Sequence, residues 1–184
     1  MSEFGESSYR RFQQGDAGAM EEIVRRYSDA LVRYGFSLVK DSFIAEDIAA
    51  ETFATLFFKK PRLKSHDHLR HYLYRVAHNK AMDYLRRHKQ SLPLEDVENV
   101  LGGGDLEAAA LRKMRNETVY VTMQKLPTQY REVLQLTYFE RFSIEQCCKI
   151  LQKNSKGVYN LLARAKAALK NLLEKEGITH EDLF

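Results

Sequence analysis

The chain has no tryptophan and only three prolines, nine glycines and two cysteines in its 184 residues. Cys147 and Cys148 are adjacent, so the sequence provides neither a disulfide framework nor a C-x-x-C pair of metal ligands. It contains no apolar run of about 18 residues, which excludes a membrane-spanning helix. Residues 1–11 lack the apolar stretch of a signal peptide. These absences exclude a disulfide-built extracellular module and predict a cytoplasmic, mainly globular protein without membrane insertion.

Charge is distributed unevenly along the chain. The net charge is +4 at pH 7, yet residues 59–89 hold ten basic and two acidic residues, and residues 149–170 hold six basic and no acidic ones. Between these stretches, residues 91–112 hold five acidic residues and one basic residue. Two basic stretches around an acidic connector favour two contacts with a polyanion, although each stretch is also compatible with a solvated helix face.

Apolar residues recur with helical spacing along most of the chain, and no segment shows the alternation that is typical of a strand. Asp16, Ser143 and Asn154 or Ser155 precede such patterns as candidate N-caps, and Pro61 and Pro127 interrupt them. The sequence therefore predicts an all-α fold. The predicted helices span about 16–38, 42–58, 67–87, 105–125, 128–139, 143–151 and 154–173.

The pattern changes in the middle of the chain. Residues 91–106 combine Pro93, acidic residues and three successive glycines at 102–104. Glycines in series cost backbone entropy inside a regular element, so this segment is predicted to be a flexible linker. We expect two small helical domains, at 1–90 and 107–176, and a C-terminal tail at 177–184.

Residues 142–166 have the pattern of a helix-turn-helix, in which a short apolar-faced helix and a polar turn precede a basic helix. The N-terminal residues of such a second helix face base edges in the major groove of duplex DNA. An ordinary helical hairpin with a basic surface is the alternative. We expect Lys153, Lys156 and Arg164 to bind phosphates, while Tyr159 and Asn160 read sequence. The full set of candidate contacts is Lys153, Ser155, Lys156, Tyr159, Asn160, Arg164 and Lys166.

The predicted helix at 67–87 mixes arginines and lysines with tyrosines. Cations neutralise phosphates and aromatic rings stack on unpaired bases, so this mixture suits single-stranded DNA. The preceding loop, residues 60–65, is placed to cover an extruded base. From the apolar spacing we expect Tyr72 and Tyr84 in the core and Tyr74 at the surface.

Four runs of residues, in order between about 16 and 176, resemble those of the extracytoplasmic-function (ECF) sigma factors of the bacterial sigma-70 family. They are AEDIAAETF at 45–53, HYLYRVAHN at 71–79 with DYLRR at 83–87, LPTQYREVL at 126–134, and YFERFS at 138–143, which leads into the helix-turn-helix. The resemblance implies a non-enzymatic, dissociable subunit that directs core RNA polymerase to promoters and melts the −10 element. The linker would thread a channel of the polymerase that RNA uses.

The resemblance also implies roles for particular residues. The first domain would bind single-stranded −10 DNA and the polymerase clamp, and the second would bind the duplex −35 element. An anti-sigma factor is an implied partner. The implied polymerase contacts are Asp47, Ala50, where the family usually has glutamine, and Glu51. The implied −10 contacts are Lys60, Arg62, Lys64, Arg75, Asn79, Lys80, Asp83, Arg86 and Arg87.

Other interpretations of the residues lead elsewhere. A free-standing helix-turn-helix regulator would bind duplex DNA tightly by itself and leave polymerase specificity unchanged. A histidine-bound metal enzyme would use the cluster His66, His68, His71 and His78, but no cysteine is nearby and we expect neither a metal nor a cofactor. We expect Cys147 and Cys148 to pack in a core, with redox sensing as the alternative.

Overall fold

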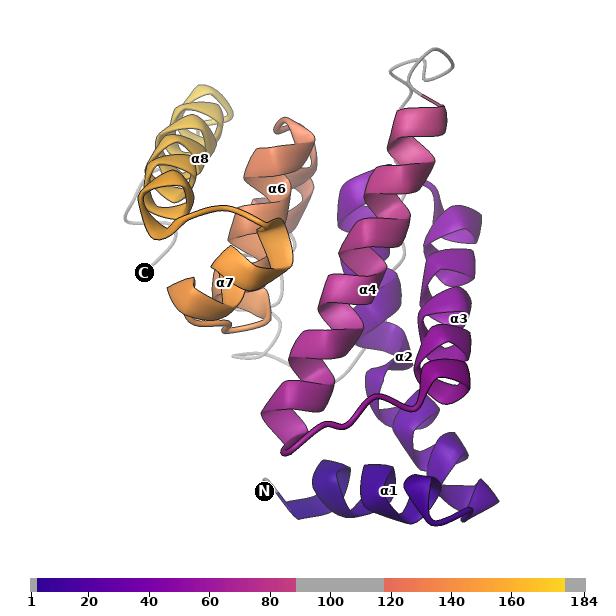
Figure 1. Cartoon of the computed structure of the whole chain (residues 1–184). Coiled ribbons are helices and arrows are strands. Elements are labelled where there is room, and N and C mark those ends of the chain that lie inside the picture. Colours follow the sequence, from indigo (N-terminus) through magenta and orange to yellow (C-terminus); the bar gives the residue numbers. More distant parts are fainter. Residues whose placement is uncertain (1–2, 89–117, 178–184) are drawn as a thin grey trace, which may run out of the picture. The chain divides into compact units, whose positions relative to one another are not determined.

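The computed structural model describes residues 3–88 and 118–177, and every regular element in these two ranges is a helix (Figure 1). We call the first range the N-terminal domain and the second the C-terminal domain, and we describe each by itself. This arrangement confirms the predicted all-α fold with two helical domains. The N-terminal helices are α1 (Glu3–Gln13), α2 (Ala17–Val39), α3 (Ser42–Lys59) and α4 (His66–Arg87). After a helix that ends at residue 124, the C-terminal domain continues with α6 (Thr128–Leu134), the π-helical segment η1 (Gln135–Phe139), α7 (Ile144–Leu151) and α8 (Ser155–Lys175).

The long N-terminal helices begin at side chains that accept hydrogen bonds from otherwise unpaired backbone N–H groups. Asp16 accepts from Gly18 N at 2.9 Å, Asp41 from Ile44 N at 3.0 Å, and Ser65 from His68 N at 3.3 Å. Each acceptor replaces water at a helix end, which is the usual reason for these residue types at N-caps. The predicted starts near residues 16, 42 and 67 are therefore correct to within a residue or two.

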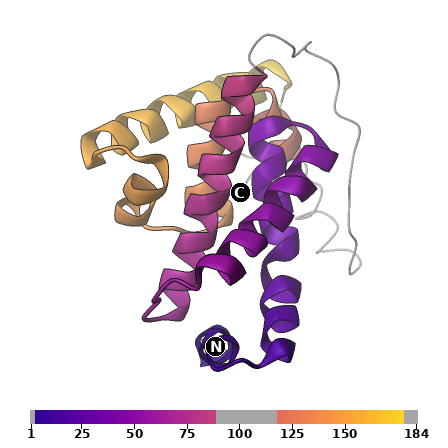
Figure 2. The same cartoon turned by 45° about the vertical axis from the view of Figure 1, so that its right-hand side comes forward.

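Helices α2, α3 and α4 pack side by side, and α1 lies across one end of them (Figure 2). The rings of Tyr34 and Tyr74 meet in this core, with centroids 5.0 Å apart, and Leu31 and Leu73 are fully buried beside them. Gly35 allows α2 to approach α3 closely, because a Cβ there would lie 3.3 Å from the Cα of Ala45. Aromatic packing and close helix contact thus hold the domain together.

Tyr74 corrects one of our expectations. The sequence pattern predicted an exposed Tyr74, but it is 1% exposed, whereas Tyr72 and Tyr84 are half-buried. Tyr74 lies one position after Leu73, and Ala77 and His78 continue the same buried face. The face that enters the core is therefore rotated towards Tyr74, a shift of one residue that periodicity alone does not resolve.

Within the C-terminal domain, α6 packs against α8. Val133 and Leu134 of α6 and Val158, Ala165 and Leu173 of α8 are all buried. The last three lie within the helix that apolar spacing predicted over about 154–173. The predicted starts of the last two helices are also correct, since α7 begins at Ile144 and Asn154 caps α8 by accepting from Gly157 N at 2.8 Å.

The predicted helix over 128–139 changes its hydrogen-bonding pattern partway. The α-helical part ends at Leu134 and continues as the π-helical segment η1. Glu140 N bonds the carbonyl of Gln135 at 3.0 Å, and Phe142 N bonds that of Leu136 at 2.9 Å. Such wide turns insert an extra residue and re-aim the side chains that follow. Nothing in the apolar spacing predicts this change.

Several predictions fall outside the described residues. The linker at 91–106 lies wholly outside them, as do residues 107–117 of the second domain and residues 178–184 of the tail. The domain limits therefore stay predictions. Conversely, α1 was not predicted, because Tyr9 and Phe12 give too short an apolar pattern to indicate a helix before Asp16.

Candidate nucleic-acid interface

Residues 60–65 form the loop between α3 and α4 that the sequence predicted. Lys60 ends α3 in the left-handed conformation, with φ at 44°, and its N–H bonds the carbonyl of Leu56 at 2.9 Å. Lys60, Arg62 and Lys64 are all exposed. The loop therefore presents three cations to solvent just before α4. Cations arranged in this way are suited to binding successive phosphates of a nucleic-acid strand.

The exposed side of α4 continues this basic surface. Arg75 and Asn79 are exposed one helical turn apart, and Arg86 and Arg87 are exposed at the end of the helix. The Arg86 side chain contacts the Asp83 carboxylate, and Arg87 Nε donates to the Asp83 carbonyl at 3.2 Å. Asp83 thus holds two arginines near the end of α4. Arg75 also lies 5.9 Å from the ring centroid of the half-buried Tyr72.

The outward side of α3 carries the three predicted polymerase contacts, Asp47, Ala50 and Glu51, and all three are exposed. The same helix exposes two large apolar side chains, Phe43 at 78% and Phe58 at 89%. Sequence reasoning missed both phenylalanines, although neither belongs to the buried stripe of this helix. Phe43 and Phe58 lie near opposite ends of α3, with the acidic residues of its exposed side between them.

One ion pair joins two of the predicted sets. Lys80 Nζ, a predicted DNA contact on α4, lies 2.8 Å from Oε2 of Glu51, a predicted polymerase contact on α3. Glu51 is 65% exposed and Lys80 is 26% exposed. An exposed pair of this kind contributes little to stability. Its importance is that the two surfaces meet at one contact.

The helix-turn-helix residues lie where the sequence predicted them. Lys153 lies in the turn, while Ser155, Lys156, Tyr159 and Asn160 are exposed in the first two turns of α8. Tyr159 is 59% exposed. Arg164 and Lys166 are exposed further along, and Lys166 Nζ lies 5.4 Å from the ring centroid of Tyr138 in η1.

The histidines do not form a metal site in the part of the chain that the structure describes. No group of three or more His, Cys, Asp or Glu side chains in residues 3–88 and 118–177 could hold a metal ion. His66 instead bonds the hydroxyl of Tyr27, at 2.7 Å between Nε2 and Oη. Burial and the nearby Arg26 lower the pKa of His66, which keeps the ring neutral at pH 7. Cys147 is buried and Cys148 is half-buried, as core packing requires.

Among the described helices, none combines the length and apolar character that crossing a membrane demands.

Two family models match the chain, one in each domain. The sigma-70 region 2 model matches residues 23–91, and the sigma-70 region 4 model matches residues 116–169. The first match contains α3, the 60–65 loop and α4, and the second contains α6 to α8 up to residue 169. Helix α1 lies before both matches.

Curated relatives match along most of the chain. The RNA polymerase sigma-H factor of Pseudomonas aeruginosa is 30% identical over 175 residues, which cover 89% of this chain and 91% of the relative. The ECF RNA polymerase sigma factor SigM of Bacillus subtilis is 28% identical over 165 residues, which cover 88% of this chain and 99% of the relative. Because both domains match together, the free-standing regulator is the weaker interpretation.

Solved structures share the fold. CnrH in complex with the cytosolic domain of CnrY matches with a TM-score of 0.63 at 24% identity, over 91% of this chain and 96% of that one. The sigma factor RpoE of Bartonella quintana, in complex with the anti-sigma factor NepR, matches with a TM-score of 0.65 at 20% identity, over 84% and 96%. Both models, these relatives and the fold agree: the chain belongs to the ECF sigma factors of the sigma-70 family, which initiate transcription with RNA polymerase and are not themselves enzymes.

Proposed function

We propose that this sigma factor acts through three surfaces: the outward side of α3 binds core RNA polymerase, the 60–65 loop and α4 bind single-stranded −10 DNA, and α8 binds duplex −35 DNA. The observation that carries the proposal is the exposed basic loop at the start of α4, inside the segment that matches sigma-70 region 2. The domain limits proposed with it are 1–90, a linker at 91–106, 107–176 and a tail at 177–184.

The polymerase surface combines Asp47, Ala50 and Glu51 with the exposed Phe43 and Phe58. Burial of the two phenylalanines against a partner would remove a large apolar area from water. The carboxylates would set the orientation of docking and speed the encounter. The Glu51–Lys80 ion pair lies at the edge of this surface, so a polymerase group that engages Glu51 would free Lys80 for DNA.

We assign an unpaired strand to the −10 surface from the resemblance to ECF sigma factors; of the three tyrosines on α4, Tyr74 is buried and Tyr72 and Tyr84 are half-buried. Its cations are Lys60, Arg62 and Lys64 of the loop together with residues of α4. Extrusion of a base costs a few kcal/mol of unstacking, and a pocket that hydrogen-bonds and stacks on the base offsets this cost. The polar and charged members on α4 are Arg75, Asn79, Lys80, Asp83, Arg86 and Arg87.

The −35 surface divides into two kinds of contact. Lys153, Lys156 and Arg164, with Ser155 and Lys166, would bind phosphates and set the register of α8 on the duplex. Tyr159 and Asn160 lie on the exposed N-terminal part of α8, where side chains reach base edges in the major groove. This division supports sequence recognition by few residues and affinity from many.

The chain would work in the cytoplasm, together with core polymerase and promoter DNA. Two structural neighbours, CnrH and RpoE, were solved with the cytosolic domain of CnrY and the anti-sigma factor NepR, respectively. An anti-sigma factor is therefore the regulatory partner that we propose for this chain. The exposed Phe43 and Phe58 support such a partner, because a partner protein would remove these apolar side chains from water while the sigma factor is not bound to polymerase.

The three surfaces are tested separately with three variants of the whole protein. Asp47→Lys is expected to weaken binding to core polymerase, Arg62→Ala to slow opening of the −10 element, and Arg164→Ala to weaken binding of the −35 duplex. Arg33→Ala, which removes an exposed arginine of α2, is the charge-matched control for the last two. If Arg62→Ala opened promoters as the wild type does, the loop would not be the −10 surface.

A further inference from the structure

Helix α1 lies before the residues that match the region 2 model, yet it contacts the 60–65 loop directly. The hydroxyl of Tyr9 donates to the carbonyl oxygen of Pro61 at 2.7 Å. The side-chain amide of Gln13 donates to the same oxygen at 3.2 Å. One carbonyl of the loop is thus bonded by two side chains of α1, which are one helical turn apart.

This carbonyl matters because the loop follows no regular pattern of backbone hydrogen bonds. Pro61 has no N–H to donate, and residues 60–64 belong to no helix. The ring of Phe12 adds to the contact: it lies 4.9 Å from the ring of Phe57 and 5.3 Å from Lys60 Nζ. Helix α1 therefore packs against the end of α3 as well as the loop.

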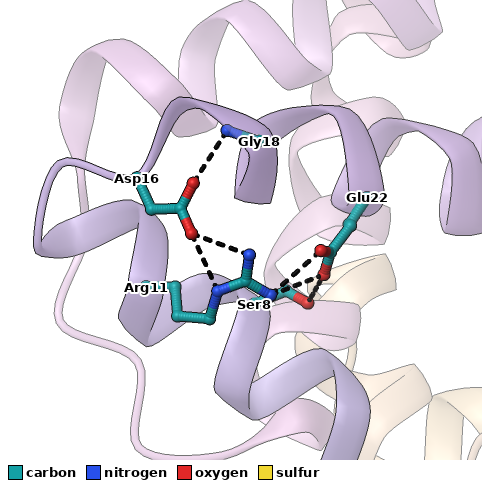
Figure 3. Close-up of polar contacts among 5 residues, drawn as sticks. All are labelled: Ser8, Arg11, Asp16, Gly18 and Glu22. Carbon is teal, nitrogen blue, oxygen red and sulfur yellow. Dashed lines mark hydrogen bonds and ion pairs between the residues drawn. The ribbon is translucent and has the colours of Figure 1, made fainter.

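The position of α1 is itself fixed by a network of charged groups at its junction with α2 (Figure 3). The Arg11 guanidinium lies between two carboxylates, with Nε 2.8 Å from Asp16 Oδ2 and one Nη 2.9 Å from Glu22 Oε1. Ser8 donates to the other oxygen of Glu22 at 2.5 Å, and Asp16 also caps α2. The hydrogen bonds from Ser8 and Arg11 lower the pKa of Glu22, and Arg11 lowers that of Asp16, so both carboxylates remain ionised at pH 7.

Tyr9 is well suited to a permanent hydrogen bond. Its side chain is 3% exposed, so the ring is part of the domain core while the hydroxyl reaches the loop. Burial raises the pKa of Tyr9 to about 12, and the hydroxyl therefore keeps its proton at every physiological pH. Gln13 is exposed and supplies the second donor from the solvent side.

The far end of the loop is also tied to the bundle. His66 is the first residue of α4, and its Nε2 lies 2.7 Å from Tyr27 Oη of α2. The loop is thus tethered at Pro61 by α1 and directly after Ser65 by α2. Between the two tethers lie Arg62, Leu63 and Lys64, the part of the loop that reaches solvent with its cations.

We propose that Tyr9 and Gln13 are positioning residues, which hold the Pro61 carbonyl so that the 60–65 loop keeps the conformation that receives the extruded −10 base. This inference rests on the proposed function of the loop. A preorganised loop does not have to be ordered when DNA arrives, so less of the binding free energy is lost. Helix α1 then contributes to promoter melting by positioning the 60–65 loop.

The restraint of the loop by Tyr9 and Gln13 can be measured without polymerase or DNA. A protease needs its substrate segment to open locally, so the rate of trypsin cleavage after Arg62 and Lys64 should report how often the loop leaves its bonded conformation. The test uses the whole protein with Tyr9→Phe, which removes one hydroxyl and keeps the ring, and with Gln13→Glu, which replaces the donor amide by an acceptor of the same shape. Gln14→Glu adds the same charge one residue further on and is the matched control.

We expect cleavage in the loop to be about two- to tenfold faster in the double variant Tyr9→Phe/Gln13→Glu than in the wild type, as the loss of ordinary hydrogen bonds implies. Each single variant leaves one donor on Pro61 and should have a smaller effect. Gln14→Glu should match the wild type. Unchanged cleavage in the double variant would overturn the proposal.

A second measurement shows whether the bonds from Tyr9 and Gln13 to the loop contribute to promoter opening. With core polymerase, the double variant should open a duplex promoter more slowly than the wild type. It should match the wild type in binding to polymerase and on a promoter that is already unpaired around −10. Normal opening by a variant with fast loop cleavage would overturn the proposal. Normal opening by Arg62→Ala would instead overturn the proposed function of the loop. The cleavage rates would still show whether Tyr9 and Gln13 restrain the loop.

Discussion

The two domains accommodate polar groups in their interiors in different ways. In the N-terminal domain, two of the buried polar side chains are hydroxyls that bond carbonyls of their own helix: Ser37 Oγ to Tyr34 at 2.7 Å and Thr52 Oγ1 to Ile48 at 2.7 Å. These two bonds stay within single helices, while the buried Ser8 and Tyr9 donate to groups of other elements, the Glu22 carboxylate and the Pro61 carbonyl. The contacts between helices there are largely apolar and aromatic, as between Tyr34 and Tyr74.

In the C-terminal domain, by contrast, charged and amide side chains are buried, among them Arg131, Glu132 and Gln135. The Arg131 side chain is 4% exposed and donates to the carbonyl of Leu126 and, at 3.1 Å, to the hydroxyl of Thr128. Gln135 Nε2 donates to Glu140 Oε1 at 3.1 Å across the π-helical segment. Burial lowers the pKa of Arg131 to about 10, so the side chain stays charged at pH 7.

This difference shows what each domain needs to keep its shape. Long helices with broad apolar faces hold the N-terminal domain, and its polar network, from Ser8 to Glu22, lies mostly at the surface. Apart from α8, which has 21 residues, the C-terminal helices α6 and α7 are short, and the segment before α6 is held by the buried Arg131 guanidinium. A domain of short helices buries less apolar surface, so it depends more on hydrogen bonds that are costly to leave unmade.

The substitution Tyr74→Ala tests most directly whether apolar and aromatic packing stabilises the N-terminal domain. Loss of a fully buried aromatic side chain should destabilise the N-terminal domain by about 3–5 kcal/mol, because it removes the ring and leaves a cavity. Denaturant unfolding with hydrogen exchange across residues 3–88 measures the effect. Tyr159→Ala, at an exposed tyrosine, is the control and should leave stability nearly unchanged. Equal stability of the two variants would mean that Tyr74 is not in the core.

Arg131→Met tests the polar side of the comparison. Methionine keeps much of the volume but leaves the Leu126 carbonyl without its donor, so we expect the C-terminal domain to lose about 3 kcal/mol of stability. Hydrogen exchange should accelerate in residues 118–177 and stay unchanged in residues 3–88. Slow exchange at wild-type rates in 118–177 would show that the guanidinium is dispensable. Arg33→Ala is the control for removal of an exposed arginine.

A pH series distinguishes the domains by a smaller effect. Because the pKa of His66 is lower in the folded protein than its usual 6.5, the unfolded chain binds more protons as the pH falls below this value. The N-terminal domain should therefore have its full stability above about pH 6.5 and lose some as the pH falls through the folded pKa of His66. Unfolding temperatures measured between pH 8 and pH 5 would show the loss.

His66→Gln sharpens this measurement, since glutamine can bond Tyr27 but does not titrate near neutral pH. The variant should show a flatter dependence of stability on pH over the same range. An unchanged slope would assign the dependence to other groups. The C-terminal domain contains no histidine among residues 118–177 and should show little dependence there.

The smallest expected effect is on binding alone. Arg164→Ala should leave the stability of both domains unchanged and weaken binding to all −35 duplexes alike. The slope of log K against log salt should fall by about one unit, as expected for one phosphate contact. Titration of labelled duplexes at several salt concentrations measures both quantities. A loss of affinity confined to one base position would instead assign Arg164 to sequence recognition.

The sequence predicted most of the fold because the chain has long apolar stripes and clear N-caps. Asp16, Asn154 and the pattern after Ser143 located three helix starts, and the basic loop at 60–65 was found from charge and Pro61. Tyr74 was misplaced because a one-residue rotation of a helix face does not alter its period. The π-helical segment and the buried Arg131 arise from tertiary packing, which no local pattern records.

The α1 contacts were missed for a related reason. Tyr9 and Pro61 are far apart in sequence, and their hydrogen bond depends on how α1 crosses the end of the bundle. The roles of the −10 and polymerase contacts came from the resemblance, whereas the contacts on α8 were predicted from the helix-turn-helix pattern. The structure adds that these side chains are exposed or half-buried and that Glu51 and Lys80 meet.

The central claim is that the chain directs core RNA polymerase to start transcription at particular promoters. Mapping of transcript starts across genomic DNA, with core polymerase in the presence and absence of the purified protein, tests it most directly. We predict new start sites that share −10 and −35 sequences and that weaken with Arg62→Ala or Arg164→Ala. Binding to polymerase without any change in where transcripts begin would contradict the account.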